Sequence, residues 1–286
     1  MAPETNPFAL PRRAVLAAGL ALVGGAAARS APQRIVSLNP CVDAILVQLV
    51  EGRRIAALSH YSREPNGSTI ADLARRLPST PGTTESVVAL DPDLVLVGGP
   101  GSEALNRSLA RLGIASERFI VPETVAASLA QIRHIARLVG EPARGEALVG
   151  RIQSALTTAA PSPGQKPVRA LVYMPGGFVS GPGTLMDELL RRVGFTNAAS
   201  GYGLSRSGTL SLERLIADPP HILLSGRAGP GSASRAERVL AHPALVAVRH
   251  RMVRADFPQA YLFCAGPVLI PAIRALVEAR QSVVRA

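Results

Sequence analysis

The sequence contains no tryptophan and few aromatic residues of any kind. Aromatic side chains make up only 3% of the 286 residues, which limits the stacking surfaces that a large planar ligand would need. Charged residues are also scarce, at 18% against 47% hydrophobic residues, and no low-complexity block occurs. A disordered or fibrous chain is therefore excluded. The length predicts a compact protein with two lobes of roughly 120 to 130 residues each.

Sequence motifs of metal centres and of catalysis are also missing. The five histidines are scattered without an H-E-x-x-H spacing, and two cysteines are too few for a cluster held by four thiolates. The glycine-rich residues 98–101 lack both G-x-G-x-x-G spacing and a Walker lysine, and no G-x-S-x-G elbow occurs. We therefore expect no metal site built from side chains, no resident cofactor and no catalytic residue. The protein is not predicted to be an enzyme.

The only long apolar run lies near the N-terminus. Arg12 and Arg13 precede residues 14–28, which contain only Ala, Val, Leu and Gly. This pattern predicts a signal peptide over residues 1–31, and the paired arginines are typical of the twin-arginine route. No later run approaches the roughly 20 apolar residues of a membrane-spanning helix. We expect export to the periplasm and cleavage near residues 28–31, with an N-terminal membrane anchor as the alternative.

Positive charge predominates over negative charge. Removal of residues 1–31 would leave 28 basic and 19 acidic residues, a formal charge of +9. The arginines are scattered, however, and no interleaving of basic and aromatic residues marks a nucleic-acid surface. We expect a small anionic ligand and no nucleic acid.

From residue 34 onward, short β-branched runs alternate with helical stretches. This alternation predicts α/β lobes with mainly parallel sheets. In the first lobe we expect strands at residues 35–38, 55–58, 94–97 and 118–121, and helices at 41–50, 85–89 and 103–112. In the second we expect strands at 168–173 and 221–224, and helices at 185–193 and 212–217.

Two consecutive helices are predicted between residues 124 and 160. The second has an apolar stripe formed by Leu148, Ile152 and Leu156 and ends at the proline-rich residues 161–167. Its length suits a bridge between lobes. The predicted organisation is an N-terminal lobe at 32–140, a linking helix and break at 141–164, and a C-terminal lobe at 165–286.

An internal repeat supports this division. Residues 85–96 (ESVVALDPDLVL) align with residues 213–224 (ERLIADPPHILL). In both segments a glutamate precedes a short apolar helix, and a proline ends that helix before a buried strand. Two copies at equivalent places predict a pseudo-symmetric protein.

Residues 34–40 (RIVSLNP), followed by an apolar helix, resemble the opening of the periplasmic binding proteins for ferric siderophores and cobalamin. Further similar pieces are residues 59–62 (SHYS), 89–95 (ALDPDLV), 183–190 (GTLMDELL), 193–197 (VGFTN) and 266–267 (GP). The resemblance implies two three-layer α/β/α lobes joined by one long backbone helix. It also implies a ligand in the cleft between the lobes and delivery to an ABC permease in the inner membrane by a monomeric receptor.

The family places its ligand at the carboxyl ends of strands, so the loops there supply the candidate residues. Tyr61 matches a tyrosine that contacts cobalamin in the cobalamin receptor, and the loop arginines suit the oxygens of an anionic chelate. Core packing of the tyrosines and solvation of the arginines are the alternatives. The predicted ligand-binding residues are Asn39, Cys41, Tyr61, Ser62, Arg63, Gly99, Gly177, Tyr202, Arg206, Arg227 and Cys264.

The ligand itself stays open between several metal chelates. The basic loops favour an anionic iron-siderophore complex, whereas the lack of cleft tryptophans disfavours cobalamin or another corrinoid. A zinc or manganese receptor lacks its histidine cluster. A metal-chelate enzyme and an envelope interaction protein are further alternatives from other functional classes.

Two further expectations concern pairs of residues, of which the cysteine pair departs from the family pattern and the glutamate pair follows it. Cys41 and Cys264 should both face the cleft, where a disulfide between the lobes is predicted. Two thiols that touch the ligand, or two separately buried cysteines, are the alternatives. Glu85 and Glu213 match the glutamates that dock the cobalamin receptor on its permease, although a helix N-terminus also favours carboxylates for electrostatic reasons alone.

Overall fold

The computed structural model describes residues 30–99, 102–226, 242–248 and 250–284. From Ala31 onward the described residues belong to one compact unit, which contains both lobes. The predicted signal peptide and Arg227 fall outside the described residues, apart from the last two positions of that peptide. Within the described part of the chain, no helix is both long and apolar enough to cross a membrane.

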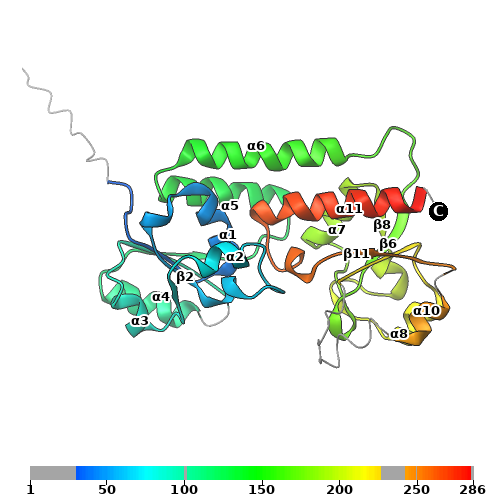
Figure 1. The fold of residues 1–286 in the computed structure, drawn as a ribbon, viewed down its shortest axis with the longest axis horizontal. Helices are drawn as coiled ribbons and strands as arrows, with labels where there is room; N and C mark the ends of the chain where they lie inside the picture. Colours follow the sequence, from blue (N-terminus) through cyan, green and yellow to red (C-terminus); the bar gives the residue numbers. More distant parts are fainter. Residues whose placement is uncertain (1–29, 100–101, 227–241, 249, 285–286) are drawn as a thin grey trace, which may run out of the picture. The chain divides into compact units, whose positions relative to one another are not determined.

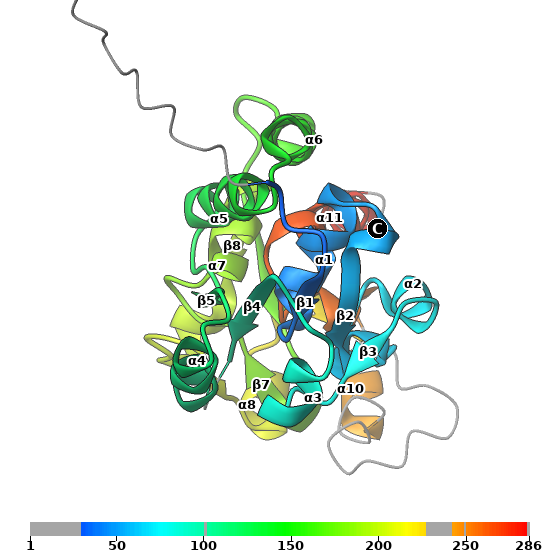
Figure 2. The ribbon, with the colours of Figure 1, turned by 90° about the vertical axis from the view of Figure 1, so that its left-hand side faces the viewer.

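The N-terminal lobe is built on a parallel sheet of five strands in the order β3-β2-β1-β4-β5 (Figure 2). The strands are β1 (Ile35–Ser37), β2 (Ile55–Ser59), β3 (Ser79–Thr80), β4 (Leu94–Gly98) and β5 (Ser116–Phe119). The helices are α1 (Pro40–Leu49), α2 (Ala71–Arg75), α3 (Thr84–Val88) and α4 (Ser102–Arg111), with short 3-10 turns η1 (Gly52–Arg54) and η2 (His60–Arg63). β1 is buried along its whole length because helices cover both faces of the sheet.

The C-terminal lobe has a parallel sheet in the order β11-β10-β6-β8 and a small antiparallel sheet of two strands. The strands of the parallel sheet are β6 (Val168–Val172), β8 (Phe195–Asn197), β10 (Ile222–Ser225) and β11 (Val253–Asp256), and the small sheet pairs β7 (Phe178–Val179) with β9 (Gly208–Thr209). Its helices are α7 (Leu185–Arg192), α8 (Leu212–Ala217), α10 (Pro243–Ala247) and α11 (Leu269–Val284), with turns η3 (Pro175–Gly177), η4 (Ala198–Tyr202), η6 (Gln259–Tyr261) and η7 (Gly266–Val268).

Alternate residues of the strands feed separate hydrophobic cores on the two faces of each sheet. In β1, Ile35 packs in the largest core, beside α1 and α5, whereas Val36 packs in a smaller one with Val87 of α3 and Leu109 of α4. In β6, Val172 joins the largest core, while Leu171 joins another on the α8 side. Both lobes therefore have three layers, as the sequence predicts.

Three long helices pack together beside the sheets (Figure 1). They are α5 (Val125–Leu138), α6 (Pro142–Ala159) and α11, and α6 contacts both of the others. Within α6, Leu148 and Ile152 are fully buried and Leu156 packs against the same core, which confirms the predicted apolar stripe. Its 18 residues rise by about 27 Å. This helix occupies the predicted linking segment.

The internal repeat appears as two matching helix and strand pairs, α3–β4 and α8–β10. The cap is equivalent too, because Thr83 accepts a hydrogen bond from the Ser86 amide and Ser211 accepts one from the Arg214 amide. The α/β fold class is therefore confirmed. The strand predicted at residues 118–121 is instead β5, two residues earlier, because Ile120 is 70% exposed and lies beyond the sheet.

Candidate functional site

A pocket of about 980 Å³ lies at the carboxyl ends of β1, β4 and β5. From β1 the chain adds β2 and β3 toward one edge of the sheet, and it then returns to add β4 and β5 toward the other edge. The strand order thus reverses between β1 and β4, and ligands bind at such a point in open parallel sheets. Its wall is made by Leu38, Asn39, Pro40, Cys41, Tyr61, Gly98, Gly99, Ser102, Glu103, Ala104, Arg107, Arg118, Phe119, Ile120, Val121, Phe263 and Cys264.

Asn39 and Gly98 form the part of the wall closest to the sheet. The Asn39 side chain caps α1 by accepting a hydrogen bond from the Cys41 amide at 2.9 Å. Its amide group lies directly against Gly98, where an added Cβ would come within 2.1 Å of Nδ2. Only glycine fits at position 98, because the end of β4 and the Asn39 side chain lie too close together for a Cβ atom. Asn39 is buried, so its first role is to shape the pocket.

Tyr61 is the most exposed aromatic residue in the pocket wall. It sits in η2, directly after β2, and is 60% exposed. Its ring lies 4.0 Å from that of His60, at 36°. The same tyrosine also borders a smaller neighbouring pocket of about 250 Å³ with Ser59 and Thr80. Tyr61 therefore presents an exposed aromatic ring to the pocket at the carboxyl edge of the sheet.

Arginine side chains supply positive charge to the part of the wall formed by α4 and β5. Arg118 of β5 donates a hydrogen bond to Glu103 of α4 at 2.6 Å. Arg107 stands one helical turn after Glu103 and is exposed, and the described residues provide it with no ion pair. The three side chains carry a net charge of +1 at the pocket.

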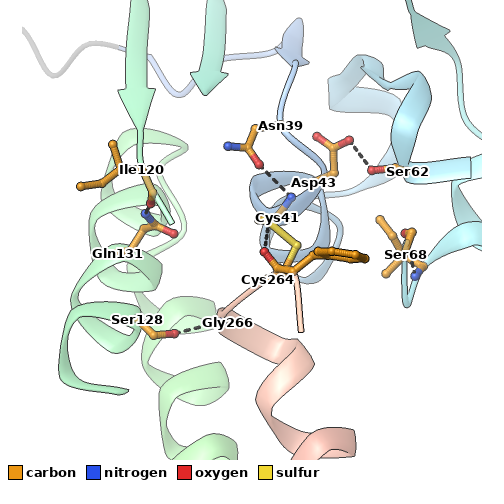
Figure 3. The surroundings of a disulfide bond; sticks show 12 residues. Asn39, Cys41, Asp43, Ser62, Ser68, Ile120, Ser128, Gln131, Cys264 and Gly266 are labelled. Carbon is orange, nitrogen blue, oxygen red and sulfur yellow. Dashed lines mark hydrogen bonds between the residues drawn. A yellow bond between two sulfur atoms is a disulfide. The ribbon is translucent and has the colours of Figure 1, made fainter. Parts of the chain in front are cut away.

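The predicted disulfide between Cys41 and Cys264 is present (Figure 3). The two Cα atoms lie 5.0 Å apart although 223 positions separate the residues in the sequence. The bond joins the first turn of α1 to the segment before α11 and brings Phe263, which is 47% exposed, into the pocket wall. A nearby hydrogen bond from the Gly266 amide to Ser128 at 2.8 Å fastens the same segment to α5. Free thiols at the ligand site are thereby ruled out.

Burial strongly perturbs one acidic group behind this wall. Asp43 of α1 is fully buried, and the loss of solvation raises its pKa to about 7, although hydrogen bonds from Ser62 and Ser59 and the nearby Ser37 hydroxyl oppose the shift. No group of three or more His, Cys, Asp or Glu side chains that could hold a metal ion occurs among the described residues.

The structure divides the predicted site residues into two groups. Those that line the pocket are Asn39, Cys41, Tyr61, Gly99 and Cys264. Those that do not are Ser62, Arg63, Gly177, Tyr202 and Arg206, while Arg227 lies outside the described residues.

Each residue of the second group is engaged elsewhere in the N-terminal or C-terminal lobe. Ser62 is buried against Asp43, and Arg63 donates to the carbonyls of Ala74 and Leu77. Tyr202 is buried and donates its hydroxyl hydrogen to the Asp218 carbonyl. These interactions favour the alternative of core packing for Tyr202.

Gly177 and Arg206 belong to segments of the C-terminal lobe. Gly177 packs against the Leu210 carbonyl beside the small β7–β9 sheet, with no room for a Cβ. Arg206 forms an exposed ion pair with Glu123 at 3.0 Å. Sequence reasoning also missed Arg107, Arg118 and Ile120 as wall residues. Ile120 could have been found from the rule that the loop after each parallel strand lies at the ligand edge, because it directly follows β5.

The family model described as "Periplasmic binding protein" matches residues 35–260. The chain therefore belongs to the periplasmic binding protein family. A search of curated proteins gives no significant match.

Solved structures with the same fold include periplasmic binding proteins for heme and for vitamin B12. The apo form of the periplasmic heme-binding protein RhuT from Roseiflexus sp. RS-1 is 25% identical, with a TM-score of 0.66 over 86% of this chain and 98% of that one. A periplasmic heme-binding protein from Pseudomonas aeruginosa is 24% identical, with a TM-score of 0.66 over 87% and 92%. The vitamin B12 binding protein BtuF of Vibrio cholerae is 18% identical, with a TM-score of 0.65 over 89% and 99%.

Proposed function

We propose that the protein is the periplasmic receptor of an ABC importer, and that it binds an anionic metal chelate in the 980 Å³ pocket and delivers it to a permease. The pocket joins residues of both lobes at the carboxyl edge of the N-terminal sheet. Its wall is preformed by strands, helix α1 and a disulfide, which suits a binding protein that holds its ligand without making or breaking bonds.

The chemistry of the wall favours an iron tetrapyrrole such as heme. Exposed apolar and aromatic side chains, among them Tyr61, Ile120 and Phe263, make up much of the surface that a ligand would meet. A flat macrocycle buries such surface efficiently. The likeness to RhuT, a heme-binding protein, points the same way. The single observation that carries this proposal is the exposed Tyr61 ring together with Phe263 and Ile120 in one pocket.

Arg107 and Arg118 favour negatively charged groups on the ligand. Arginine forms charge-assisted hydrogen bonds with carboxylates, hydroxamates and catecholates. Heme carries two carboxylates at its edge, so one part of the pocket would hold the ring and another its acidic edge. The same arginines support the second candidate, the iron-siderophore complex favoured by the sequence. Cobalamin carries a single phosphodiester and no carboxylate, hydroxamate or catecholate, and it ranks below both.

Direct titration separates these ligands. Purified protein is titrated with hemin, with ferric hydroxamate and catecholate complexes, and with cyanocobalamin, and binding is followed by absorbance and calorimetry. We expect hemin to bind most tightly. Tight binding of a siderophore with weak binding of hemin would reverse the order of the candidates. Binding of none of them would overturn the proposed function and favour the envelope interaction protein.

A variant at Tyr61 tests whether the pocket is the binding site. Tyr61→Ala removes an exposed aromatic face from the wall, and we expect hemin to bind about tenfold or more weakly because the apolar contact is lost. Phe178→Ala is the matched control, since Phe178 is 45% exposed and lies outside the pocket. Equal affinities of both variants and the native protein would move the site away from Tyr61.

A further inference from the structure

Asp43 is a fully buried carboxylic acid on α1, beside the turn that carries Tyr61 (Figure 3). Its Oδ2 atom accepts two hydrogen bonds, from the Ser59 amide at 2.9 Å and from the Ser62 hydroxyl at 2.6 Å. These two donors lie on either side of Tyr61 in the sequence. One carboxylate oxygen therefore holds both ends of the short segment that presents Tyr61 to the pocket.

The other side of this carboxyl group faces the buried Ser37 hydroxyl, which favours the ionised form. Asp43 Oδ1 and Ser37 Oγ are buried, and neither has a hydrogen bond of ordinary length and angle with any described residue. A buried polar atom without a partner lowers stability. An apolar side chain at position 43 would leave the buried Ser59 amide and Ser62 hydroxyl without their acceptor, so the aspartate also serves the local fold.

Charged side chains of the neighbouring elements are turned away from Asp43. On η2, Arg63 donates to carbonyls of the α2 region, and His60 approaches the Thr80 carbonyl and the Tyr61 ring. α1, β1, β2 and η7 contain no other ionisable residue besides the disulfide cysteine. The other ionisable residues on helices packed against α1 also have partners elsewhere or are exposed. On α5, Arg133 pairs with Glu146 of α6, His134 makes a hydrogen bond with Glu117, and Arg137 is exposed. On α6, Arg144 and Arg151 bind the far end of α1.

We propose that Asp43 is a positioning residue of the ligand site, whose ionised carboxylate fixes the Tyr61 turn in its binding geometry. The identity of the ligand in this inference rests on the proposed function. The tether, which is the pair of hydrogen bonds from Ser59 and Ser62 to Asp43, does not depend on it. An ionised carboxylate accepts stronger hydrogen bonds than a neutral carboxyl group does. When Asp43 takes up a proton, the two bonds to Ser59 and Ser62 weaken and Tyr61 gains freedom. Because burial raises the pKa of Asp43 to about 7, this change falls near neutral pH.

The first test compares hemin affinity between the native protein and Asp43→Asn from about pH 5.5 to about pH 8.5. Asparagine keeps the shape and the acceptor but cannot ionise. We expect the variant to bind about three- to tenfold more weakly at the high end and within about twofold at the low end. The ratio of the two dissociation constants is the readout, because titration of hemin itself cancels in it.

The matched control is Asp187→Asn in the other lobe. Asp187 is also a buried aspartate, and it accepts hydrogen bonds from the Gly183 amide and the Asn197 side chain, away from the pocket. Its variant should leave the affinity ratio near one at every pH. Ser62→Ala, which deletes one tether and keeps the carboxyl group, replaces Asp43→Asn if that variant does not fold, and should weaken binding most at high pH.

A second measurement needs no ligand. In the amide NMR spectrum of the free protein, the Ser59 resonance should move through one transition near pH 7, and this transition should be absent in Asp43→Asn. If hemin binds and the affinity ratio stays constant with pH, the positioning role is overturned. If hemin does not bind at all, the proposed ligand is wrong. The Ser59 transition then decides alone: its presence supports the role of Asp43, and its absence overturns it.

Discussion

Asp43 should make the stability of the protein depend on pH. Its folded pKa of about 7 lies above the ordinary aspartate value of 3.8, so between these two values the folded state holds more protons than the unfolded state. The free energy of unfolding therefore falls as pH rises from about 4 to about 7, by at most about 1.4 kcal/mol per pH unit, and levels off above that range. Urea denaturation at several pH values measures this slope.

The variant Asp43→Asn isolates the effect, because an amide does not titrate. Its stability relative to the native protein should rise with pH over the same range. Parallel curves for the two proteins would show that Asp43 has an ordinary pKa in the folded state.

Single residues were the hardest part of the site to predict from the sequence. Tyr61 was found because it falls in a predicted loop and matches a tyrosine that contacts the ligand in the cobalamin receptor, as the resemblance implies. Tyr202 and Arg63 also lie near loops in the sequence, but their partners are backbone carbonyls of Asp218, Ala74 and Leu77, which only the tertiary structure brings near. Asp43 stands alone in an apolar helix, and no local pattern indicates that two serines bind it.

At the scale of elements, the disulfide joins α1 to the segment before α11. It closes a loop of 223 residues, so its loss should lower the free energy of unfolding by about 2 to 5 kcal/mol. The comparison is between native protein and the double variant Cys41→Ala/Cys264→Ala in urea. Alanine is the better replacement because both positions are buried among apolar neighbours. Equal midpoints under oxidising conditions would mean that the bond does not restrict the unfolded chain.

The same bond should matter for binding, because it holds Phe263 in the pocket wall. Reduction of the native protein should therefore weaken hemin binding, whereas the double alanine variant should bind weakly with or without reductant. Calorimetry with and without a phosphine reductant decides this. A native affinity that does not change after confirmed reduction would show that other contacts hold the Phe263 segment.

Elements with a clear hydrophobic period were predicted well, and short edge elements were not. The apolar stripe of α6 and the repeated α3–β4 and α8–β10 pairs are visible because burial repeats along them. β3 has only Ser79 and Thr80, and β11 alternates between partly buried and exposed residues at the sheet edge, so neither forms an apolar run. The disulfide was predicted because two cysteines in an exported chain tend to pair, although distance along the chain gives no sign of it.

For the whole molecule, the predicted export would precede ligand binding and delivery. The pair Arg12-Arg13 and the apolar residues 14–28 predict that mature protein recovered from the periplasm begins near residues 28–33. N-terminal sequencing checks this. Recovery of periplasmic protein with an intact Met1 would contradict cleavage, and the membrane anchor would then replace the signal peptide. Changing Arg12 and Arg13 to Lys tests the twin-arginine route, because that route depends on the arginine pair.

Delivery to the permease should depend on the two lobes together. Glu85 and Glu213 are exposed at the first turns of α3 and α8, which lie on the same side of the compact unit, one from each lobe (Figure 1). The caps of both helices are Thr83 and Ser211, so neither glutamate is needed as the N-cap. The backbone and Ser211 nonetheless lower the pKa of Glu213, which keeps it charged.

Reversal of both charges tests docking. The double variant Glu85→Arg/Glu213→Arg should abolish ligand uptake in cells, because opposite charges on the two lobes and the permease are proposed to set the encounter and register between them. Ligand affinity should not change, and the loss of stability should stay within about 1 kcal/mol per helix, which is the contribution of one surface charge at a helix end.

The control variant is Glu146→Arg/Glu278→Arg, on α6 and α11, which makes the same change in net charge elsewhere and should leave uptake intact. Full uptake by the first variant would assign docking to other residues, and a large drop in its melting temperature would favour the purely electrostatic role of the two glutamates in their helices.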